Sequence, residues 1–339
     1  MLAVFPHLSA ATYPRHGLHD SARAWPETNC YSDLFIETLH TLGREPAAAF
    51  GIGVAQDFEG DQFTFFKIPS ADLEALFGLD VQELSIYRPL VDHVEEQLAR
   101  GRLLLVEVDA FHLADTRGIT YRTEHSKTTI AINSFDRSRA RLGYFHNAGY
   151  FEADGADVEG LLGYGSAPRP QLPPFCEFVK ITGPGLHGEA LSCAARERFA
   201  GHWARRPRTN PVDAYRVALT QHLDRLAKEP SCSFHPYAFN TTRQFGANMA
   251  LLGAHLAWLD GEARGSLGEA AALCEQMATG AKTLQFLLAR ALARKRFDKL
   301  DPALDAIGRD YDAAMTAIAS ALRLPLVAQE APALVPAGT

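Results

Sequence analysis

Hydrophobic and polar residues follow two different patterns along the chain, and the change falls near residue 180. Before it, short apolar segments typical of strands are mixed with short helical patterns. After it, apolar residues recur at helical spacing in long stretches. We expect strands at 63–68, 103–111, 127–133, 142–147 and 175–181. We expect helices at 29–40, 70–77, 91–100, 211–227, 240–258, 266–297 and from 302 onward. The pattern predicts an α+β half followed by a mostly α-helical C-terminal half.

The segment 103–111 is the clearest strand in the chain. Its first four residues are apolar without a break, which indicates burial on both faces of a sheet. Glu107 and Asp109 then alternate to one side, and a loop rich in polar residues, including Tyr121 and Arg122, follows. An ion-paired sheet edge is the ordinary interpretation. We keep Asp109, Tyr121 and Arg122 as candidate supporting or substrate-binding residues.

The segments 127–133 and 142–147 are separated by a charged turn, which predicts an antiparallel pair. The start of one strand in such a pair lies near the end of the other. We therefore expect His125 to lie near His146 and Asn147. These last two side chains point to opposite faces, so only one can reach His125. We favour Asn147, because an amide can orient an imidazole without competing for its proton.

The helix expected at 29–40 carries a cysteine in its first turn. Thr28 or Asn29 is a plausible N-cap, and Leu34 and Leu39 give the helix an inward face. The free N–H groups and the positive dipole at a helix N-terminus favour a thiolate. Cys30 is thus the best candidate nucleophile, although most free cysteines are small core residues. Cys30, His125 and Asn147 together supply a nucleophile, a base and an orienting group.

Length and composition set the remaining limits. A chain of 339 residues with 47% hydrophobic content can form two domains, which we place at 1–180 and 181–325. The Ala- and Pro-rich tail 326–339 is expected to be disordered.

A net charge of -7 argues against nucleic-acid binding, and no apolar run is long enough to span a membrane. The five scattered cysteines and the missing signal-peptide pattern favour the cytoplasm. We expect no cofactor and no metal.

Two motifs carry a family resemblance. Asn29-Cys30-Tyr31 near the start and the segment 144–150, which reads Tyr-Phe-His-Asn-Ala-Gly-Tyr, resemble those of an uncharacterised bacterial family filed as a domain of unknown function. The resemblance covers nearly all of the chain. It implies little about function.

Residues 25–155 more distantly resemble the N-terminal domain of butirosin-biosynthesis acyltransferases, which has a papain-like fold. A helix-start cysteine, a Val-Asp strand end and a histidine that opens a strand match here in order as Cys30, Asp109 and His125. Such enzymes move an aminoacyl group from a carrier-protein thioester to an amine. The resemblance therefore implies that Cys30 is acylated, with His125 as its base and with a carrier protein and a small-molecule amine as partners. Asn29 or the Cys30 N–H would take the place of the usual oxyanion-binding Gln.

Three functions follow from these residues. The first is a cysteine-dependent acyltransferase, amidohydrolase or peptidase. The second is a catalytically silent papain-like scaffold that binds a small metabolite or a protein partner through its helical half, where 241–244 at a helix start could meet an anion. The third is a metal hydrolase, for which the candidate ligands lack a recognised spacing. These ligands are Asp109, His112, His125 and His146. An acidic carrier protein could dock on basic clusters at Arg290, Arg294, Lys295 and Arg296, or at Arg205, Arg206 and Arg208.

Overall fold

The computed structural model describes residues 1–167, 172–261 and 265–326. Two compact units make up this part of the chain. The first contains residues 1–49 and 67–191, and the second contains residues 50–66 and the described residues from 192 onward. The tail for which we expect disorder lies outside the described residues except for Leu326.

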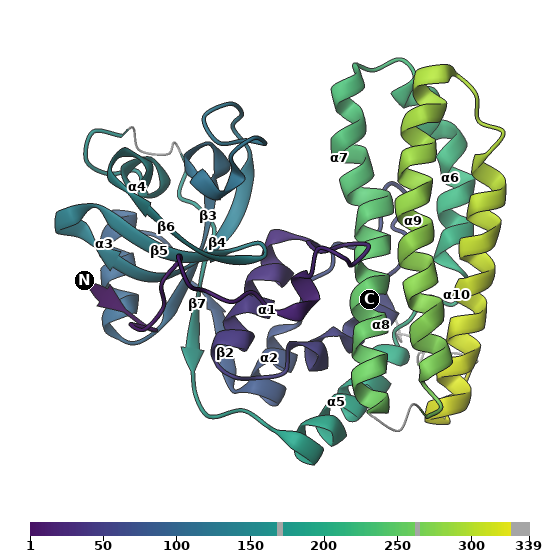
Figure 1. The fold of residues 1–339 in the computed structure, drawn as a ribbon, viewed down its shortest axis with the longest axis horizontal. Coiled ribbons are helices and arrows are strands. Elements are labelled where there is room, and N and C mark those ends of the chain that lie inside the picture. The colour runs from purple at the N-terminus through teal and green to yellow at the C-terminus, as the bar shows by residue number, and fades with distance from the viewer. Residues whose placement is uncertain (168–171, 262–264, 327–339) are drawn as a thin grey trace, which may run out of the picture. The chain divides into compact units, whose positions relative to one another are not determined.

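The first unit is built on a seven-stranded antiparallel sheet (Figure 1). Its strand order is β2-β7-β3-β4-β5-β6, with the short β1 paired to β4. The apolar start of β3 lies in the interior of the sheet between β7 and β4, which explains why its residues are apolar without alternation. The strands are β1 Leu2–Ala3, β2 Leu79–Glu83, β3 Leu103–Asp109, β4 Lys127–Asp136, β5 Arg141–His146, β6 Gly149–Asp154 and β7 Cys176–Ile181.

Helices cover both faces of this sheet (Figure 1). The first helix, α1, packs on β4, β5 and β6, whereas α3 and α4 pack on the other face. Alternate strand residues such as Leu104, Ile130 and Tyr144 form one apolar core with α3 and α4. The helices are α1 Cys30–Thr41, α2 Ser70–Phe77, α3 Leu90–Ala99 and α4 Gly155–Leu162. Short 3-10 turns are Gly17–His19, Pro46–Ala55, Ala110–His112, Ala114–Thr116 and Arg137–Arg139.

A buried ionic cluster holds the irregular entry segment on α1. Nδ1 of His19 lies 2.5 Å from Oε1 of Glu37, and Nε2 lies 3.5 Å from Oδ1 of Asp33. All three side chains are almost fully buried. Burial lowers the pKa of His19, but the two carboxylates outweigh it and raise that pKa to about 9. Tyr13 donates to Glu37, and Thr28 donates to Asp33.

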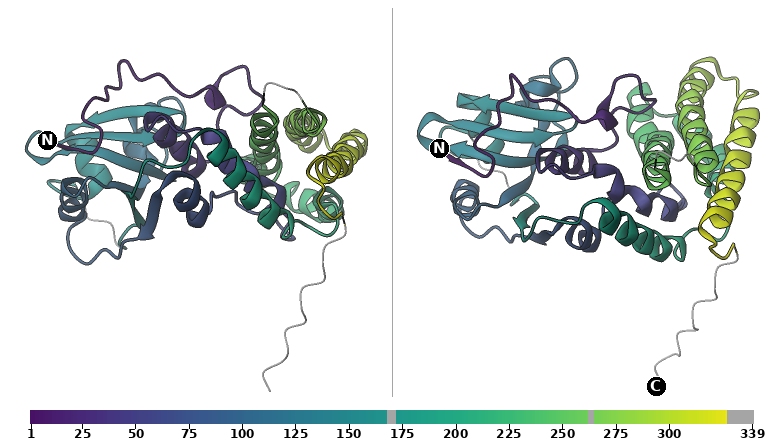
Figure 2. Two further views of the ribbon diagram at one scale, coloured as in Figure 1. Left: turned by 90° about the horizontal axis from the view of Figure 1, so that it is seen from below. Right: turned by 60° about the horizontal axis from the view of Figure 1, so that its bottom comes forward.

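The second unit is helical (Figure 2). Its longest helices, α8, α9 and α10, pack side by side. The π-helical turn Phe239–Arg243 joins α7 to α8, so the chain is helical without a break from 234 to 260. The helices after residue 187 are α5 Gly188–Trp203, α6 Pro211–Leu226, α7 Phe234–Ala238, α8 Gln244–Asp260, α9 Gly268–Arg294 and α10 Leu300–Leu322, with a 3-10 turn at Ser231–Ser233.

The structure confirms the α+β first half and the helical second half, and it corrects two segments. Residues 63–68 do not form a strand; only a single bridge joins Phe58 to Phe63. The helix expected to begin at residue 240 begins at Phe234 instead, because Pro236 is accepted in a first helical turn. The backbone N–H groups of 241–244 therefore lie inside a helix, and the expectation of an anion at a helix start there is wrong.

Candidate active site

The end of β3 and the start of β4 bring an aspartate and a histidine together. Asp109 pairs with Lys127 in the sheet, two residues after His125. Nδ1 of His125 lies 2.5 Å from Oδ2 of Asp109. The other carboxylate oxygen accepts the N–H groups of Phe111, at 3.0 Å, and Ser126, at 3.2 Å. Burial raises the pKa of Asp109, but these three hydrogen bonds outweigh it and hold that pKa below its usual range.

The His125 ring is fixed from a second direction. It stacks on Phe111, with the ring centroids 4.5 Å apart and the planes 12° from parallel. The guanidinium of Arg122 lies 5.5 Å from the centroid of the same Phe111 ring. The His125 side chain is nonetheless 74% exposed. The imidazole is therefore oriented by the protein and still accessible from solvent.

Tyr121 and Arg122 anchor the loop that carries His125. Tyr121 Oη donates to Asp157 Oδ2 at 2.8 Å, and Arg122 forms an ion pair with the same carboxylate. Arg122 has a positive φ of 59°, which marks it as a turn residue. The structure thus gives both residues a role in attaching the loop to α4.

A cavity of 420 Å³ lies beside the Asp109–His125 pair. Its lining combines apolar side chains with the polar ends of β3 and β4. Lys127 Nζ forms an ion pair with Glu107 Oε1 at 2.6 Å on the sheet next to it. The lining residues are Leu90, Glu107, Val108, Asp109, His125, Ser126, Lys127, Gly160, Leu161 and Pro174.

Cys30 is the first residue of α1, and its side chain is half-buried. Asn29 caps the helix, because its Oδ1 accepts the N–H of Ser32 at 3.0 Å. The next residue, Tyr31, lies under Lys67, whose Nζ is 4.0 Å from the ring centroid and 3.4 Å from Oε1 of Glu177. Glu177 pairs with Leu105 of β3.

These contacts place the start of α1 beside β7 and β3 at the level of Leu105. Leu105 and Asp109 are four strand residues apart, which corresponds to about 13 Å. Within the described part of the chain, Cys30 Sγ and His125 make no hydrogen bond with each other. The structure thus brings the histidine and Asp109 into contact and places the cysteine on a neighbouring element.

Asn147 does not lie beside His125, where the pairing of 127–133 with 142–147 predicts it. Ala131 pairs with Phe145, so Asn147 is level with Thr129, four residues or about 13 Å short of His125. The chain turns back at Asn147, with a φ of 43°, and continues as β6. The expected Asn147–His125 contact is therefore wrong, and Asp109 takes the place beside Nδ1. The polar end of β3 was the signal for this partner.

His146 belongs to a separate, buried network. Its Nδ1 lies 2.6 Å from Asp115 Oδ2 and its Nε2 lies 2.8 Å from Thr128 Oγ1. Tyr144, two residues earlier on the same strand, donates to Asp115 and lies in the core with α3 and α4. His146 therefore lies on the face opposite α1 and acts as a structural residue.

The four other cysteines differ from Cys30 in their surroundings. Burial raises the pKa of Cys176 to about 12 and also raises that of Cys274. Cys193 and Cys232 are exposed. The described residues contain no group of three or more His, Cys, Asp or Glu side chains arranged to hold a metal ion. No helix in the same ranges is long and apolar enough to cross a bilayer.

The fold defines an α+β domain built on an antiparallel sheet, followed by a helical domain. Comparison with family models identifies both parts. The chain belongs to the DUF1839 family: residues 14–181 match the DUF1839 N-terminal domain, and residues 188–320 match the DUF1839 C-terminal domain. The function of this family is unknown. A comparison with curated proteins found no match. The resemblance to a domain of unknown function is confirmed.

Proposed function

We propose that the protein is a cysteine-dependent acyl or aminoacyl transferase with a papain-like N-terminal domain. The observation that carries the proposal is the 2.5 Å contact between His125 and Asp109 at the end of β3. A carboxylate that accepts the Nδ1 proton leaves the Nε2 lone pair of an imidazole available as a base. Cys30 at the start of α1 is the nucleophile in this proposal.

The proposed reaction has two steps, and each moves one proton. In the first, His125 takes the Cys30 proton and the thiolate attacks the carbonyl carbon of a thioester. The new C–S bond forms as the old one breaks, and the departing thiol takes the proton from His125. In the second step an amine attacks the Cys30 thioester. The C–N bond forms, the C–S bond breaks, and the amine proton returns to Cys30 through His125. The backbone N–H of Cys30 is the proposed donor to the oxyanion.

The proposal requires Cys30 and His125 to approach each other in the substrate complex. Catalytic hydrogen bonds are often long in free enzymes and tighten when substrate binds. The exposed His125 ring leaves room for a substrate carbonyl to enter. Asp109 and Phe111 keep the ring in one orientation meanwhile.

A carrier protein is the proposed acyl donor, and one of the two basic clusters fits it. Arg206 is buried, and its guanidinium stacks 4.0 Å from the Trp203 ring centroid, so this member of the cluster at 205–208 has a structural role. The cluster at the end of α9 is exposed, and Asp298 is the acidic residue beside it. An acidic carrier surface is complementary to that cluster. Its members are Arg290, Arg294, Lys295 and Arg296.

Mass spectrometry with a small acyl donor tests this proposal. The purified chain is incubated with the N-acetylcysteamine thioester of glycine and digested for peptide mapping. We expect the mass of one glycyl group on the Cys30 peptide, a loss of that mass in Cys30→Ala, and slower acylation in His125→Ala. Cys193→Ala is the matched control and should not change the Cys30 signal, because Cys193 is an exposed residue of α5. Equal acylation of Cys193 and Cys232 would contradict the proposal.

A second candidate function is the binding of a small metabolite without catalysis. A cavity of 580 Å³ in the helical unit favours it, because this cavity is larger than the one beside His125. Saturable binding by a protein whose Cys30 is not acylated would support this second function.

A further inference from the structure

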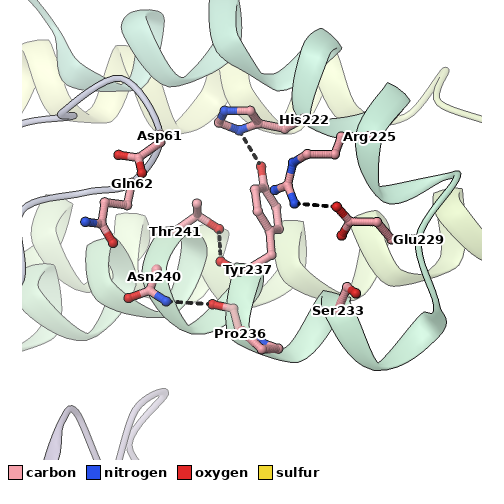
Figure 3. Close-up of a pocket in the computed structure, with 10 residues that line it drawn as sticks. All are labelled: Asp61, Gln62, His222, Arg225, Glu229, Ser233, Pro236, Tyr237, Asn240 and Thr241. Carbon is pink, nitrogen blue, oxygen red and sulfur yellow. Dashed lines mark hydrogen bonds and ion pairs between the residues drawn. The ribbon is translucent and has the colours of Figure 1, made fainter.

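A polar cavity of 580 Å³ opens in the helical unit beside the π-helical turn (Figure 3). Its volume falls within the range of small-molecule sites. Three segments contribute to it: the acidic turn 57–62, helix α6, and the stretch from Glu229 to Thr241. The lining residues are Asp61, Gln62, His222, Arg225, Glu229, Ser233, Pro236, Tyr237, Asn240 and Thr241.

The walls of this cavity are held in place. A π-helical turn shifts the backbone pairing, and the carbonyl of Asn240 accepts the N–H of Phe63 at 3.1 Å. Phe63 is buried, with its ring centroid 5.0 Å from that of Phe245 and 5.5 Å from that of Tyr215. The N–H of Glu59 donates to the carbonyl of Gln62 at 2.8 Å and closes the acidic turn. The turn is therefore anchored to the helix at the edge of the cavity, and π-helical turns often occur at functional sites.

Two hydrogen bonds within the lining engage donors of Asn240 and Thr241, whose oxygen atoms can still accept a hydrogen bond. Asn240 Nδ2 donates to the Pro236 carbonyl at 2.8 Å, and its Oδ1 can accept a hydrogen bond from a ligand. Thr241 Oγ1 donates to the Tyr237 carbonyl at 2.8 Å. Tyr237 Oη lies 3.2 Å from Nδ1 of His222 (Figure 3). Burial and the nearby Arg225 lower the pKa of His222, while Asp61 raises it less, so this ring is neutral at pH 7.

The charges of the lining leave one carboxylate without a counterion. Arg225 Nη1 lies 2.8 Å from Oε1 of Glu229, which follows the end of α6, so these two charges offset each other. The carboxylate of Asp61 makes no hydrogen bond or ion pair with any residue of the described chain. Asp61 lies on the side of the cavity opposite Arg225 (Figure 3). An anion would meet two carboxylates here, whereas a cation would meet an unpaired one.

We propose that this cavity binds a small organic cation whose ammonium group pairs with Asp61 and whose remaining N–H donors meet Asn240. The inference gives the binding-scaffold candidate its ligand class, and it does not depend on the chemistry of Cys30. A ligand with several N–H or O–H donors matches the acceptors that the lining leaves available. Gln62 and Ser233 add polar contacts at the rim.

Calorimetric titration with three probes of equal length tests this inference on the full chain. The probes are putrescine, 1,4-butanediol and succinate, each at the same ionic strength. We expect saturable binding of putrescine and no binding of the neutral and anionic probes. Asp61→Asn should weaken putrescine binding at least about tenfold, since it removes the unpaired charge. Asp224→Asn should change the affinity by less than about twofold, because this exposed α6 residue is not part of the lining.

A second variant separates the cavity from general attraction to an acidic protein. Ser233→Trp fills the cavity without changing its charge and should abolish putrescine binding, with thermal unfolding as the check on folding. Unchanged binding in Asp61→Asn, unchanged binding in a folded Ser233→Trp, or a preference for succinate would overturn the inference. Failure of Cys30 acylation would not overturn this inference, because that result concerns the first unit alone.

Discussion

Nδ1 of His125 and Oδ2 of Asp109 lie 2.5 Å apart, across the end of β3 and the start of β4. This contact gives Asp109 a pKa below its usual range. Removal of the imidazole in His125→Ala should therefore raise the pKa of Asp109, because burial, which favours the neutral acid, then meets fewer opposing hydrogen bonds. A ¹³C NMR titration of the Asp109 carboxyl measures the change. His187→Ala, an exposed histidine bonded to its own loop, is the control. An unchanged Asp109 pKa would show that the contact does not persist in solution.

The lowered pKa of Asp109 also changes how the stability of the fold depends on pH. A carboxyl whose pKa is depressed in the folded state stabilises the fold above its unfolded pKa, near 3.8, and loses that contribution as the pH falls through the folded value. The acid side of the unfolding curve should therefore be less steep in His125→Ala than in the wild type.

The buried cluster of His19, Asp33 and Glu37 should dominate the pH dependence of the first unit. The raised pKa of His19 stabilises the fold fully below its unfolded value of 6.5, and this contribution is lost as the pH rises through about 9. Burial raises the pKa of Glu37, but its hydrogen bonds with His19, Tyr13 and His16 outweigh it, so its contribution is complete above 4.5 and is lost at lower pH. We expect maximal stability between these two unfolded values.

Removal of the cationic member tests this cluster. His19→Ala leaves two buried carboxylates without their partner and should cost about 3–5 kcal/mol of unfolding free energy at pH 6. The difference from wild type should shrink at pH 9, where His19 loses its proton. Urea unfolding at both pH values measures it, and His7→Ala, at an exposed position, is the control. Equal losses at pH 6 and pH 9 would mean that His19 acts by packing alone.

His146 is predicted to matter for folding and not for chemistry. His146→Ala leaves Thr128 Oγ1 and one carboxylate oxygen of Asp115 without a partner on the buried face, while Tyr144 still donates to the other oxygen, and it should cost about 1–3 kcal/mol. Since His146 lies on the face opposite α1, the rate of Cys30 alkylation should not change. Urea unfolding and thiol labelling of the same variant separate the two effects. Slower alkylation of Cys30 in this variant would show that His146 influences the thiol.

A close approach of three strands should make Gly143 intolerant of any side chain. A Cβ at this position would overlap Tyr150 Oη and Ser134 Oγ. Tyr150 cannot move freely, because its hydroxyl accepts a hydrogen bond from Asn133 at 3.0 Å. Gly143→Ala should therefore destabilise the fold by about 1–3 kcal/mol, measured by thermal unfolding. Gly17→Ala, with open space around its Cβ, is the matched control and should have little effect.

Local sequence patterns predicted most elements of the fold. Asn29 as a cap and the apolar stripe of Leu34 and Leu39 located α1 to within one residue, and the continuous apolar run of β3 marked an interior strand. Three strands, β1, β2 and β6, and helices α4 and α5 were not predicted. The strands and α4 are short and gain their order from pairing or packing with distant segments. Residues 63–68 have strand-like composition, but the rings of Phe63 and Phe66 pack within the helical unit.

Local sequence patterns also predicted only part of the candidate site. The residues Cys30, Asp109 and His125 could be chosen from the sequence, because each stands at the end of a predictable element. The partner of His125 could not be chosen from the sequence, because the choice between Asn147 and Asp109 depends on where β5 turns back. That turn at Asn147 comes four residues too early to reach His125, whereas the end of β3 lies next to it. Register, which a single sequence does not specify, decided between Asn147 and Asp109.

The most direct test of the central claim is the alkylation rate of Cys30 in the native protein. Iodoacetamide labelling from pH 6 to pH 9 with peptide mapping compares all five cysteines in one experiment. The exposed Cys193 and Cys232 are the references, and the buried Cys176 and Cys274 should react slowest. We predict that Cys30 reacts at least about tenfold faster than the references at pH 7. This advantage should be lost in His125→Ala and reduced in Asp109→Asn. A Cys30 that reacts no faster than Cys193 and Cys232, or that is unaffected by His125→Ala, would contradict the account.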